Sequence, residues 1–286
     1  MISYKLMLKI VTPLIMGGAN PRELVFRISE IKGLLRYWYR LSNIVHLEMN
    51  TLRDRENTLF GSTSRASDIW LWGHIEGEVR EWNYNRRRVN RNIWKVHRSI
   101  RNPGYWKGIK RAYASGSIIR INVGFYHFDG DKYLDFWKTL WAMVYMGGIG
   151  RRWKRALGSV YLDVEKSNIP SEVAHFFDIT SLDELENVKK FYYRGMSWVG
   201  LDEVVDIHYQ LVKKDELLVQ IVNTLDNISV YCGRVNGGSR KIALKWVKNL
   251  PLIGSDSFDY ILIVVDASRI YKMRNDIQVV NCHGHR

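Results

Sequence analysis

The chain has 286 residues, of which 46% are apolar and 13% aromatic, so it can bury one large hydrophobic core or two ordinary ones. This composition excludes a wholly disordered chain. The longest apolar runs, such as residues 260–265, are far shorter than the roughly 18 to 20 residues of a membrane span, and residues 1–11 do not resemble a signal peptide. Cys232 and Cys282 support neither a disulfide framework nor a cysteine-based zinc site. We therefore expect a soluble, cytoplasmic protein with no membrane partner and no cofactor.

The formal net charge is +14, and a basic excess of this size suggests a polyanionic partner. The excess is unevenly distributed. Residues 1–165 contain 28 Lys and Arg against 14 Asp and Glu, whereas residues 166–286 contain 15 of each kind. The whole excess therefore lies in the N-terminal part of the chain, which favours an anion-binding first domain over a general effect on solubility.

Alternating and helical apolar patterns predict the elements of this N-terminal part. Strands are predicted at residues 2–11, 69–79, 117–128 and 159–164. Amphipathic helices are predicted at residues 29–41 and 131–146. The order strand, helix, strand, strand, helix, strand is that of a ferredoxin-like (RRM-like) α+β domain, with an antiparallel sheet and helices on one face. We assign this domain to residues 1–165.

Residues 166–286 predict a second, smaller ferredoxin-like α+β domain. The chain turns acidic and less aromatic after residue 166, and then offers strands at residues 204–212 and 260–265 and a helix at residues 215–230. The prediction for the whole chain is therefore a tandem of two such domains.

A basic, aromatic insertion at residues 80–116 separates the second and third strands of the first domain, and it is too long for a hairpin turn. From Trp82 through Phe128 there are eleven Lys or Arg and no Asp or Glu. Cations replace the counterions of phosphates, and aromatic faces stack on unpaired bases. The candidate RNA-binding residues here are Arg86, Arg87, Arg88, Arg91, Trp94, Arg98 and Trp106. The alternatives are that the aromatic residues lie buried beneath a solvated basic face, or that the insertion docks on an acidic protein.

A glycine-rich loop at residues 146–159 follows the second predicted helix. Glycines let backbone N–H groups approach an anion closely, and nearby cations add positive charge. The candidate RNA-binding residues here are Gly148, Gly150, Arg151, Arg152, Lys154 and Arg155. The loop lacks the GKS or GKT ending of a phosphate-binding Walker loop. The alternative is that Gly148 and Gly150 only end the helix.

Several of these features occur together in a known family. They are Thr12-Pro13 after the first strand, Gly17-Gly18, the helix at residues 31–40, Leu59-Phe60-Gly61-Ser62 and the loop at residues 147–160. This set resembles the RAMP superfamily of CRISPR proteins, and within it the first-subunit family of the type III-B (Cmr) effector complex. Ala156 departs from the pattern, because the family usually has a glycine at this point of the loop.

The resemblance implies a noncatalytic RNA-binding subunit of an antiviral ribonucleoprotein, near the 3′ part of the CRISPR RNA, that helps to capture the complementary target RNA. Its implied partners are the CRISPR RNA, the target RNA and the other Cmr subunits. Carried over to this sequence, the resemblance places the helix cations Lys32, Arg36 and Arg40 and the cations of the glycine-rich loop against RNA.

A metal-independent RAMP endoribonuclease that processes CRISPR RNA is the main alternative. Metal-free RNA cleavage needs a general base and a general acid, often including a histidine. His46 follows the first helix, where Tyr37 and Lys32 would assist it, but a surface histidine near a helix end is the simpler interpretation. Asp129 and Asp131 are expected to form a turn before the second helix rather than a metal site.

Two further readings stay open. The terminal Cys282-His283-Gly284-His285 resembles a metal-binding fragment, but is more typical of a frayed tail. The chain is also compatible with a protein scaffold whose basic loop docks on an acidic neighbour.

Overall fold

The computed structural model of the protein describes the first two thirds of the chain with gaps, and beyond them a set of strands. The described residues are 2–17, 23–43, 46–81, 111–127, 129–151, 153–154, 157–179, 183–185, 187, 192–193, 196–197, 206–213, 231–235, 241–243, 245–251, 260–266 and 277–281. No helix in this described part is long and apolar enough to cross a membrane.

A four-stranded antiparallel sheet forms the base of the N-terminal part. Its strands are β1 (Ile2–Ile10), β2 (Ile69–Glu76), β5 (Ile118–Phe125) and β6 (Val160–Leu162), in the spatial order β2-β5-β1-β6. Every neighbouring pair is antiparallel. The α+β class with an antiparallel sheet, predicted from the sequence, is confirmed.

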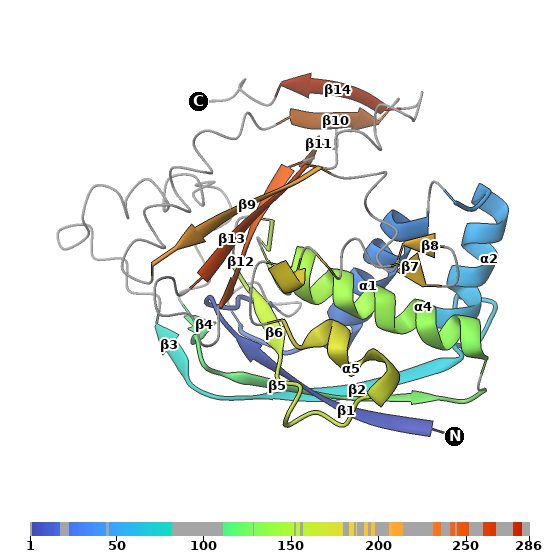
Figure 1. Ribbon diagram of the computed structural model, residues 1–286, viewed down its shortest axis with the longest axis horizontal. Coiled ribbons are helices and arrows are strands. Elements are labelled where there is room, and N and C mark those ends of the chain that lie inside the picture. The colour runs from blue at the N-terminus through green and yellow to red at the C-terminus, as the bar shows by residue number, and fades with distance from the viewer. Residues whose placement is uncertain are drawn as a thin grey trace.

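Helices cover one face of this sheet (Figure 1). Between β1 and β2 the chain forms α1 (Ile28–Asn43) and α2 (Met49–Phe60). Between β5 and β6 it forms α4 (Gly130–Trp141), which continues into the π-helix η1 (Ala142–Met146). The predicted helix at residues 131–146 therefore exists, but its last turn widens to π geometry before the glycine-rich loop.

The core lies between the helices and the sheet. Leu6, Leu8 and Ile10 of β1 point toward the helices, where they join Trp38 of α1 and Trp137 of α4 in one buried cluster. Burying large aromatic side chains of this kind supplies much of the driving force for folding. The alternation of β1 and the helical period of α1 are thus both explained by one apolar layer.

Asp129 caps the N-terminus of α4. Its carboxylate accepts a hydrogen bond from the backbone N–H of Asp131 at 3.1 Å, and it also receives the Lys132 side chain in an ion pair at 3.3 Å. Together these contacts hold its pKa below the usual range, against the opposing effect of desolvation. Asp129 thus precedes the helix as predicted, as its N-cap, whereas Asp131 lies in the first turn of α4 and not in a turn before it.

A short pair of strands marks the two ends of the insertion. Strand β3 (Val79–Glu81) pairs antiparallel with β4 (Arg111–Tyr113), so the chain leaves and re-enters at adjacent positions. Residues 82–110, which include most of the predicted insertion, lie outside the described residues.

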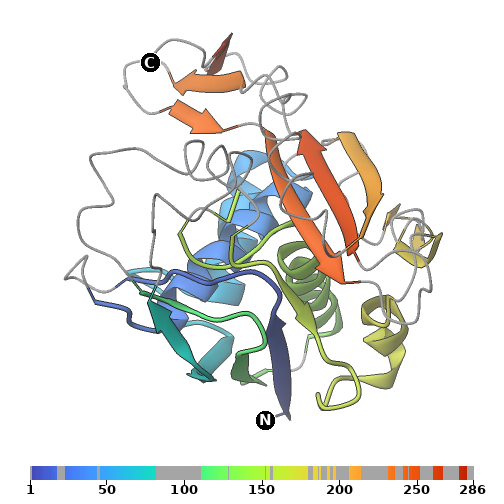
Figure 2. The ribbon, with the colours of Figure 1, turned by 90° about the vertical axis from the view of Figure 1, so that its left-hand side faces the viewer.

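The C-terminal part contributes further antiparallel strands after the short helix α5 (Ser171–Phe177). They are β7 (Tyr192–Tyr193), β8 (Met196–Ser197), β9 (Asp206–Val212), β10 (Tyr231–Val235), β11 (Lys241–Ala243), β12 (Lys245–Pro251), β13 (Tyr260–Asp266) and β14 (Ile277–Asn281). Strand β13 pairs with β12 and β9, and this sheet lies beside β6 (Figures 1 and 2). Its Ile261, Ile263 and Val265 belong to the same buried cluster as β1. The predicted helix at residues 215–230 lies outside the described residues, and a tandem of two ferredoxin-like domains stays a prediction.

Candidate nucleic-acid interface

The segment that follows β1 holds the base of the insertion. Leu14 and Tyr113 exchange two backbone hydrogen bonds, from Leu14 N to Tyr113 O at 3.0 Å and from Tyr113 N to Leu14 O at 2.9 Å. Tyr113 is the last residue of β4, which closes the insertion. The chain leaving the insertion is therefore fixed to Leu14, and the chain entering it is held indirectly, through the pairing of β3 with β4.

The same segment also holds the glycine-rich loop. Gly158 donates its backbone N–H to Pro13 O at 3.0 Å, and Arg151 donates to Ile15 O at 2.7 Å. The side chain of Thr12 accepts from Ser159 N at 3.0 Å. We call residues 12–17, 111–114, 147–151 and 157–159 the loop junction. The end of the basic insertion at β4 and the two described ends of the glycine-rich loop, which the sequence predicts separately, thus meet at one place in the fold.

The glycines of the loop are required by close backbone packing. Gly150 has a φ of +83° and Gly158 a φ of +59°, which are left-handed conformations that side chains rarely adopt. A Cβ on Gly150 would lie 2.6 Å from Ile15 O, and one on Gly148 would lie 2.9 Å from Gly158 O. The structure therefore gives Gly148 and Gly150 a packing role inside the loop junction. A direct contact of either with phosphate stays a prediction.

Arg151 lies on the outer side of this packing, against the backbone of Gly17. A Cβ on Gly17 would come within 2.8 Å of Arg151 Nη2, so any larger residue there would displace the guanidinium from this position. Burial raises the pKa of the Glu30 carboxyl, and the positive charges of Arg27 and Arg151 oppose that rise. The charge of Arg151 is thus placed at the junction between the loop and the start of α1.

Lys154 turns toward aromatic rings. Its Nζ lies 3.4 Å from Tyr37 Oη, 5.1 Å from the centroid of the Tyr37 ring and 5.3 Å from that of Trp153. Aromatic faces stabilise a cation, but burial of this ammonium lowers its pKa to about 8. Lys154 therefore carries its charge at neutral pH and loses much of it above pH 8.

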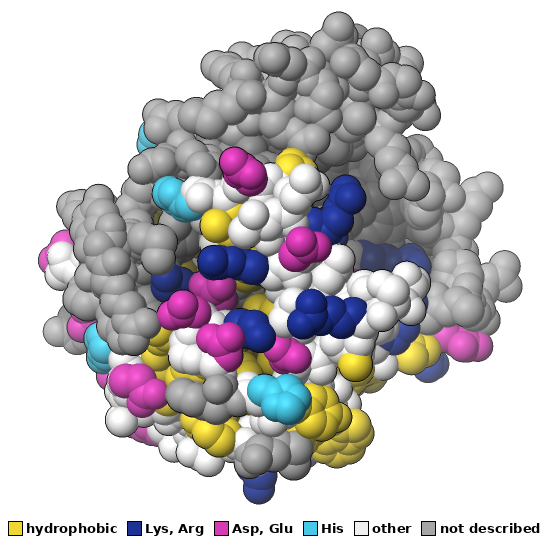
Figure 3. Space-filling view, turned by 90° about the vertical axis from the view of Figure 1, so that its right-hand side faces the viewer, with side chains coloured by type: hydrophobic (Ala, Val, Ile, Leu, Met, Phe, Trp, Pro, Cys, Tyr) yellow, Lys and Arg dark blue, Asp and Glu magenta, His cyan; other side chains and the backbone are white. Residues whose placement is uncertain are grey.

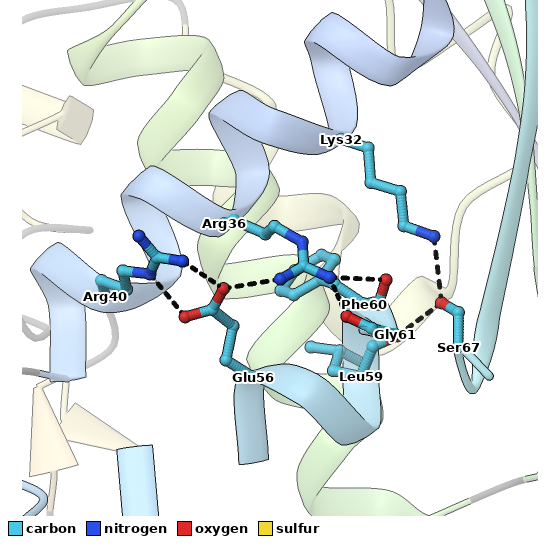
Figure 4. Close-up of polar contacts among 8 residues, drawn as sticks. All are labelled: Lys32, Arg36, Arg40, Glu56, Leu59, Phe60, Gly61 and Ser67. Carbon is cyan, nitrogen blue, oxygen red and sulfur yellow. Dashed lines mark hydrogen bonds and ion pairs between the residues drawn. The ribbon is translucent and has the colours of Figure 1, made fainter. Parts of the chain in front are cut away.

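Two of the three predicted helix cations are held by a buried carboxylate (Figure 4). Arg36 of α1 donates to Glu56 Oε1 at 2.8 Å, and Arg40 donates to the same oxygen at 2.7 Å. Arg36 also donates to the carbonyl oxygens of Phe60 and Gly61 at the end of α2. The side chain of Glu56 is only 4% exposed. These contacts tie α1 to α2, so Arg36 and Arg40 have a structural role whether or not they reach RNA.

The third helix cation, Lys32, donates from Nζ to Ser67 Oγ at 3.2 Å (Figure 4). Its pKa is lowered, first by burial and then by the charge of Arg36. Seen from the side of α2, basic and acidic side chains alternate over the described surface (Figure 3). Contact of Lys32, Arg36 and Arg40 with RNA stays a prediction, and the described contacts favour anchoring for Arg36 above all.

The remaining predicted RNA-binding residues lie outside the described part of the chain. They are Arg152 and Arg155 of the glycine-rich loop, and Arg86, Arg87, Arg88, Arg91, Trp94, Arg98 and Trp106 of the insertion. His46 is described, and it is an exposed residue whose backbone N–H donates to Asn43 O at 3.1 Å just after α1. Within the described residues, no three His, Cys, Asp or Glu side chains gather in a way that would hold a metal ion. The tail from Cys282 onward lies outside them.

Sequence reasoning missed the residues that organise this region. Glu56, which orients Arg36 and Arg40, lies in a helix that the apolar pattern did not predict. Trp153 and Tyr37 surround Lys154, and the only signal for them was aromatic residues beside cations in the sequence. Leu14, which contacts both sides of the loop junction, carried no signal, because its partners are far away in the chain.

Comparisons with known proteins place the chain in a family. A sequence model of the RAMP superfamily matches residues 7–161. The Cmr subunit Cmr1-2 of the CRISPR system of Pyrococcus furiosus is 27% identical over 175 residues, which cover 54% of this chain and 91% of that protein. The subunit Cmr1-1 of the same organism is 24% identical over 167 residues, covering 57% of this chain and 48% of that protein.

Solved structures share the fold. The crystal structure of apo Cmr1 from Pyrococcus furiosus covers 100% of this chain and 90% of its own, with a TM-score of 0.69 and 18% identity. A chain in the cryo-EM structure of the type III-B Cmr-beta complex bound to cognate target RNA covers 92% of this chain and 94% of its own, with a TM-score of 0.56 and 14% identity. The family model spans more than half of the sequence, from β1 to β6. The chain therefore belongs to the RAMP superfamily and is related to Cmr1 of type III-B CRISPR Cmr complexes.

Proposed function

We propose that this chain is a noncatalytic RNA-binding subunit of a type III-B CRISPR ribonucleoprotein, located near the 3′ part of the CRISPR RNA and helping to capture the complementary target RNA. The observation that carries the proposal is the position of the charge. The entire +14 balance lies in residues 1–165, and the RAMP model matches residues 7–161 of the same part. A charge balance of this kind supplies the salt-dependent part of nucleic-acid affinity.

The loop junction gives this charge a place in the fold. It holds β4, at the end of the insertion, and the backbone of Arg151 on the adjacent residues Leu14 and Ile15, so the described ends of the two basic stretches lie together. The related chain in the Cmr-beta structure belongs to a complex bound to cognate target RNA. Both observations support RNA as the polyanion and other Cmr subunits as protein partners.

The proposal is tested by measuring how RNA affinity depends on salt. Replacing Arg151 and Arg152 by Ala removes two cations from the glycine-rich loop, and each lost phosphate contact flattens the dependence of log K on log salt by about 0.7. We expect weaker binding of a labelled single-stranded RNA and a slope flatter by about 1.4. Lys166→Ala with Lys213→Ala is the matched control, since both lysines are exposed and lie outside the charged N-terminal part. Equal affinity and slope for the two double variants would overturn the assigned site.

The processing-enzyme alternative is tested separately. The purified chain is incubated with CRISPR repeat RNA in a chelator, which removes metal-dependent contaminants from consideration. We expect no specific cleavage. Cleavage at a defined position that disappears in His46→Ala would show that the chain is an endoribonuclease and would contradict the noncatalytic role.

A further inference from the structure

The four-stranded sheet has one face that no described helix covers. Directly opposite residues in neighbouring strands point to the same side of a sheet, and successive residues alternate between sides. Leu6, Ile121 and Val123 lie on the core side with their strand partners, so the residues between them point to the other side. Figure 1 shows α1 and α4 on only one side of β1, β2 and β5.

Aromatic side chains follow β2 on this uncovered face. Trp70, Trp72 and His74 are spaced two residues apart, so their side chains share one side of the strand. Trp72 is 56% exposed, and its ring centroid lies 5.4 Å from that of His74. Trp72 therefore presents a large aromatic surface to solvent, and its side chain is not part of the buried hydrophobic core.

Trp70 of the same strand packs against the neighbouring strand β5. Its partner across the ladder is Gly124, and a Cβ there would lie 1.9 Å from Trp70 Nε1, so the indole ring occupies the space that any other residue would fill. Trp70 is only partly exposed as a result. The row thus has one ring, Trp70, packed against Gly124 and one ring, Trp72, that is exposed to solvent.

Polar and cationic side chains complete the rows that cross the sheet. The ladder aligns Trp72 with Asn122 of β5 and Lys5 of β1, and Lys5 is exposed. Two strand spacings separate Trp72 from Lys5, which is about 10 Å. The next row aligns His74 with Arg120, whose side chain is 41% exposed.

The described charged side chains on this face sum to a positive charge, although two of the cations form ion pairs with carboxylates. Arg120 Nε lies 2.7 Å from Glu76 Oε1, and the Nε2 atom of His74 contacts the same carboxylate oxygen. Lys9 pairs with Asp163, which is buried, at 2.8 Å. Lys5 has no ion pair among the described residues, so it adds uncompensated charge in the same cross-strand row as the exposed indole.

We propose that this uncovered face is a second RNA-contacting surface, on which an unpaired base stacks on Trp72, the amide of Asn122 meets the base edge, and Lys5 and Arg120 contact phosphates. Aromatic residues on an open sheet stack unpaired bases, and lysine favours a polyanion over a protein, since it is depleted in protein interfaces. The proposal rests on the proposed function only in taking RNA as the ligand, because its residues are separate from the loop junction.

The test compares two substitutions of one exposed residue. Trp72→Phe keeps an aromatic face, whereas Trp72→Leu keeps an apolar side chain that cannot stack. Loss of one stacked base weakens binding of a labelled single-stranded RNA by about 5- to 150-fold, so we expect this loss in Trp72→Leu and most of the affinity retained in Trp72→Phe. Equal unfolding midpoints for both variants and the wild type show that the fold is intact. RNA carrying 4-thiouridine should crosslink to the peptide of residues 69–76.

Three outcomes separate this inference from the proposed function. If Trp72→Leu binds RNA like the wild type while Arg151→Ala with Arg152→Ala binds weakly, the sheet surface is wrong and the proposed function stands. If both bind like the wild type, both are wrong. If Trp72→Leu keeps its RNA affinity but no longer joins the Cmr particle, the face binds protein and the inference is overturned.

Discussion

The buried carboxylate of Glu56 offers a direct test of how the first helix is held. Glu56→Gln keeps the size of the side chain but removes the negative charge between Arg36 and Arg40. Breaking a buried ion pair costs about 3 to 5 kcal/mol, whereas an exposed pair contributes at most about 1 kcal/mol. The Arg36 side chain is 24% exposed and the Arg40 side chain 58% exposed, so only the Arg36 pair approaches the buried value. Since Arg36 keeps two carbonyl acceptors, we expect a loss of about 2 to 3 kcal/mol in the free energy of unfolding.

The assay is urea unfolding followed by tryptophan fluorescence and by far-UV circular dichroism, whose transitions must coincide for a two-state free energy. Asp54→Asn is the matched control, because it makes the same acid-to-amide change at an exposed position of α2. We expect that control to stay within about 0.5 kcal/mol of the wild type. If Glu56→Gln is as stable as Asp54→Asn, Glu56 does not anchor α1, and Arg36 and Arg40 are freer for RNA than the structure indicates.

Three further predictions follow from individual side chains. Burial raises the pKa of Asp135 to about 6, so the charged form of this side chain destabilises the fold increasingly as pH rises from 4 to 6. Asp135→Asn should therefore raise the free energy of unfolding at pH 8, by at most about 3 kcal/mol, and leave it nearly unchanged at pH 4. Gly150→Ala should destabilise the loop junction by more than about 1 kcal/mol. A Cβ at Gly33 would meet nothing within 4 Å, so Gly33→Ala should stabilise α1 by up to about 1 kcal/mol. Equal unfolding midpoints for the two variants would contradict this contrast. If Lys154 contacts RNA, affinity should fall between pH 7 and pH 9 in the wild type and not in Lys154→Met, and parallel pH profiles would exclude that contact.

The strands of the four-stranded sheet and the helices α1 and α4 were predictable because each has one buried face. β1 alternates, and α1 repeats its apolar residues at helical spacing, so the period alone identifies both. Helix α2 was not predicted for a physical reason. Its buried face includes Glu56 between Leu52 and Leu59, and a charged residue at that position breaks the apolar period until its arginine partners are known.

The position of the charge was predictable, but the orientation of each cation was not. The helical period places Lys32, Arg36 and Arg40 on one polar face, which sequence reasoning takes to be a face turned to a ligand. The structure places α2 there, because a polar face is also buried when a carboxylate satisfies it. The loop junction was equally hidden, since it joins Leu14 to Tyr113 across about a hundred residues of sequence.

RNA crosslinking of the assembled Cmr particle, followed by mass spectrometry of the crosslinked peptides, tests the central claim most directly. We expect crosslinks in residues 82–110 and 151–155, the two basic stretches of the N-terminal part whose described ends are held at the loop junction. Crosslinks confined to residues 166–286, where the charges balance, would contradict it.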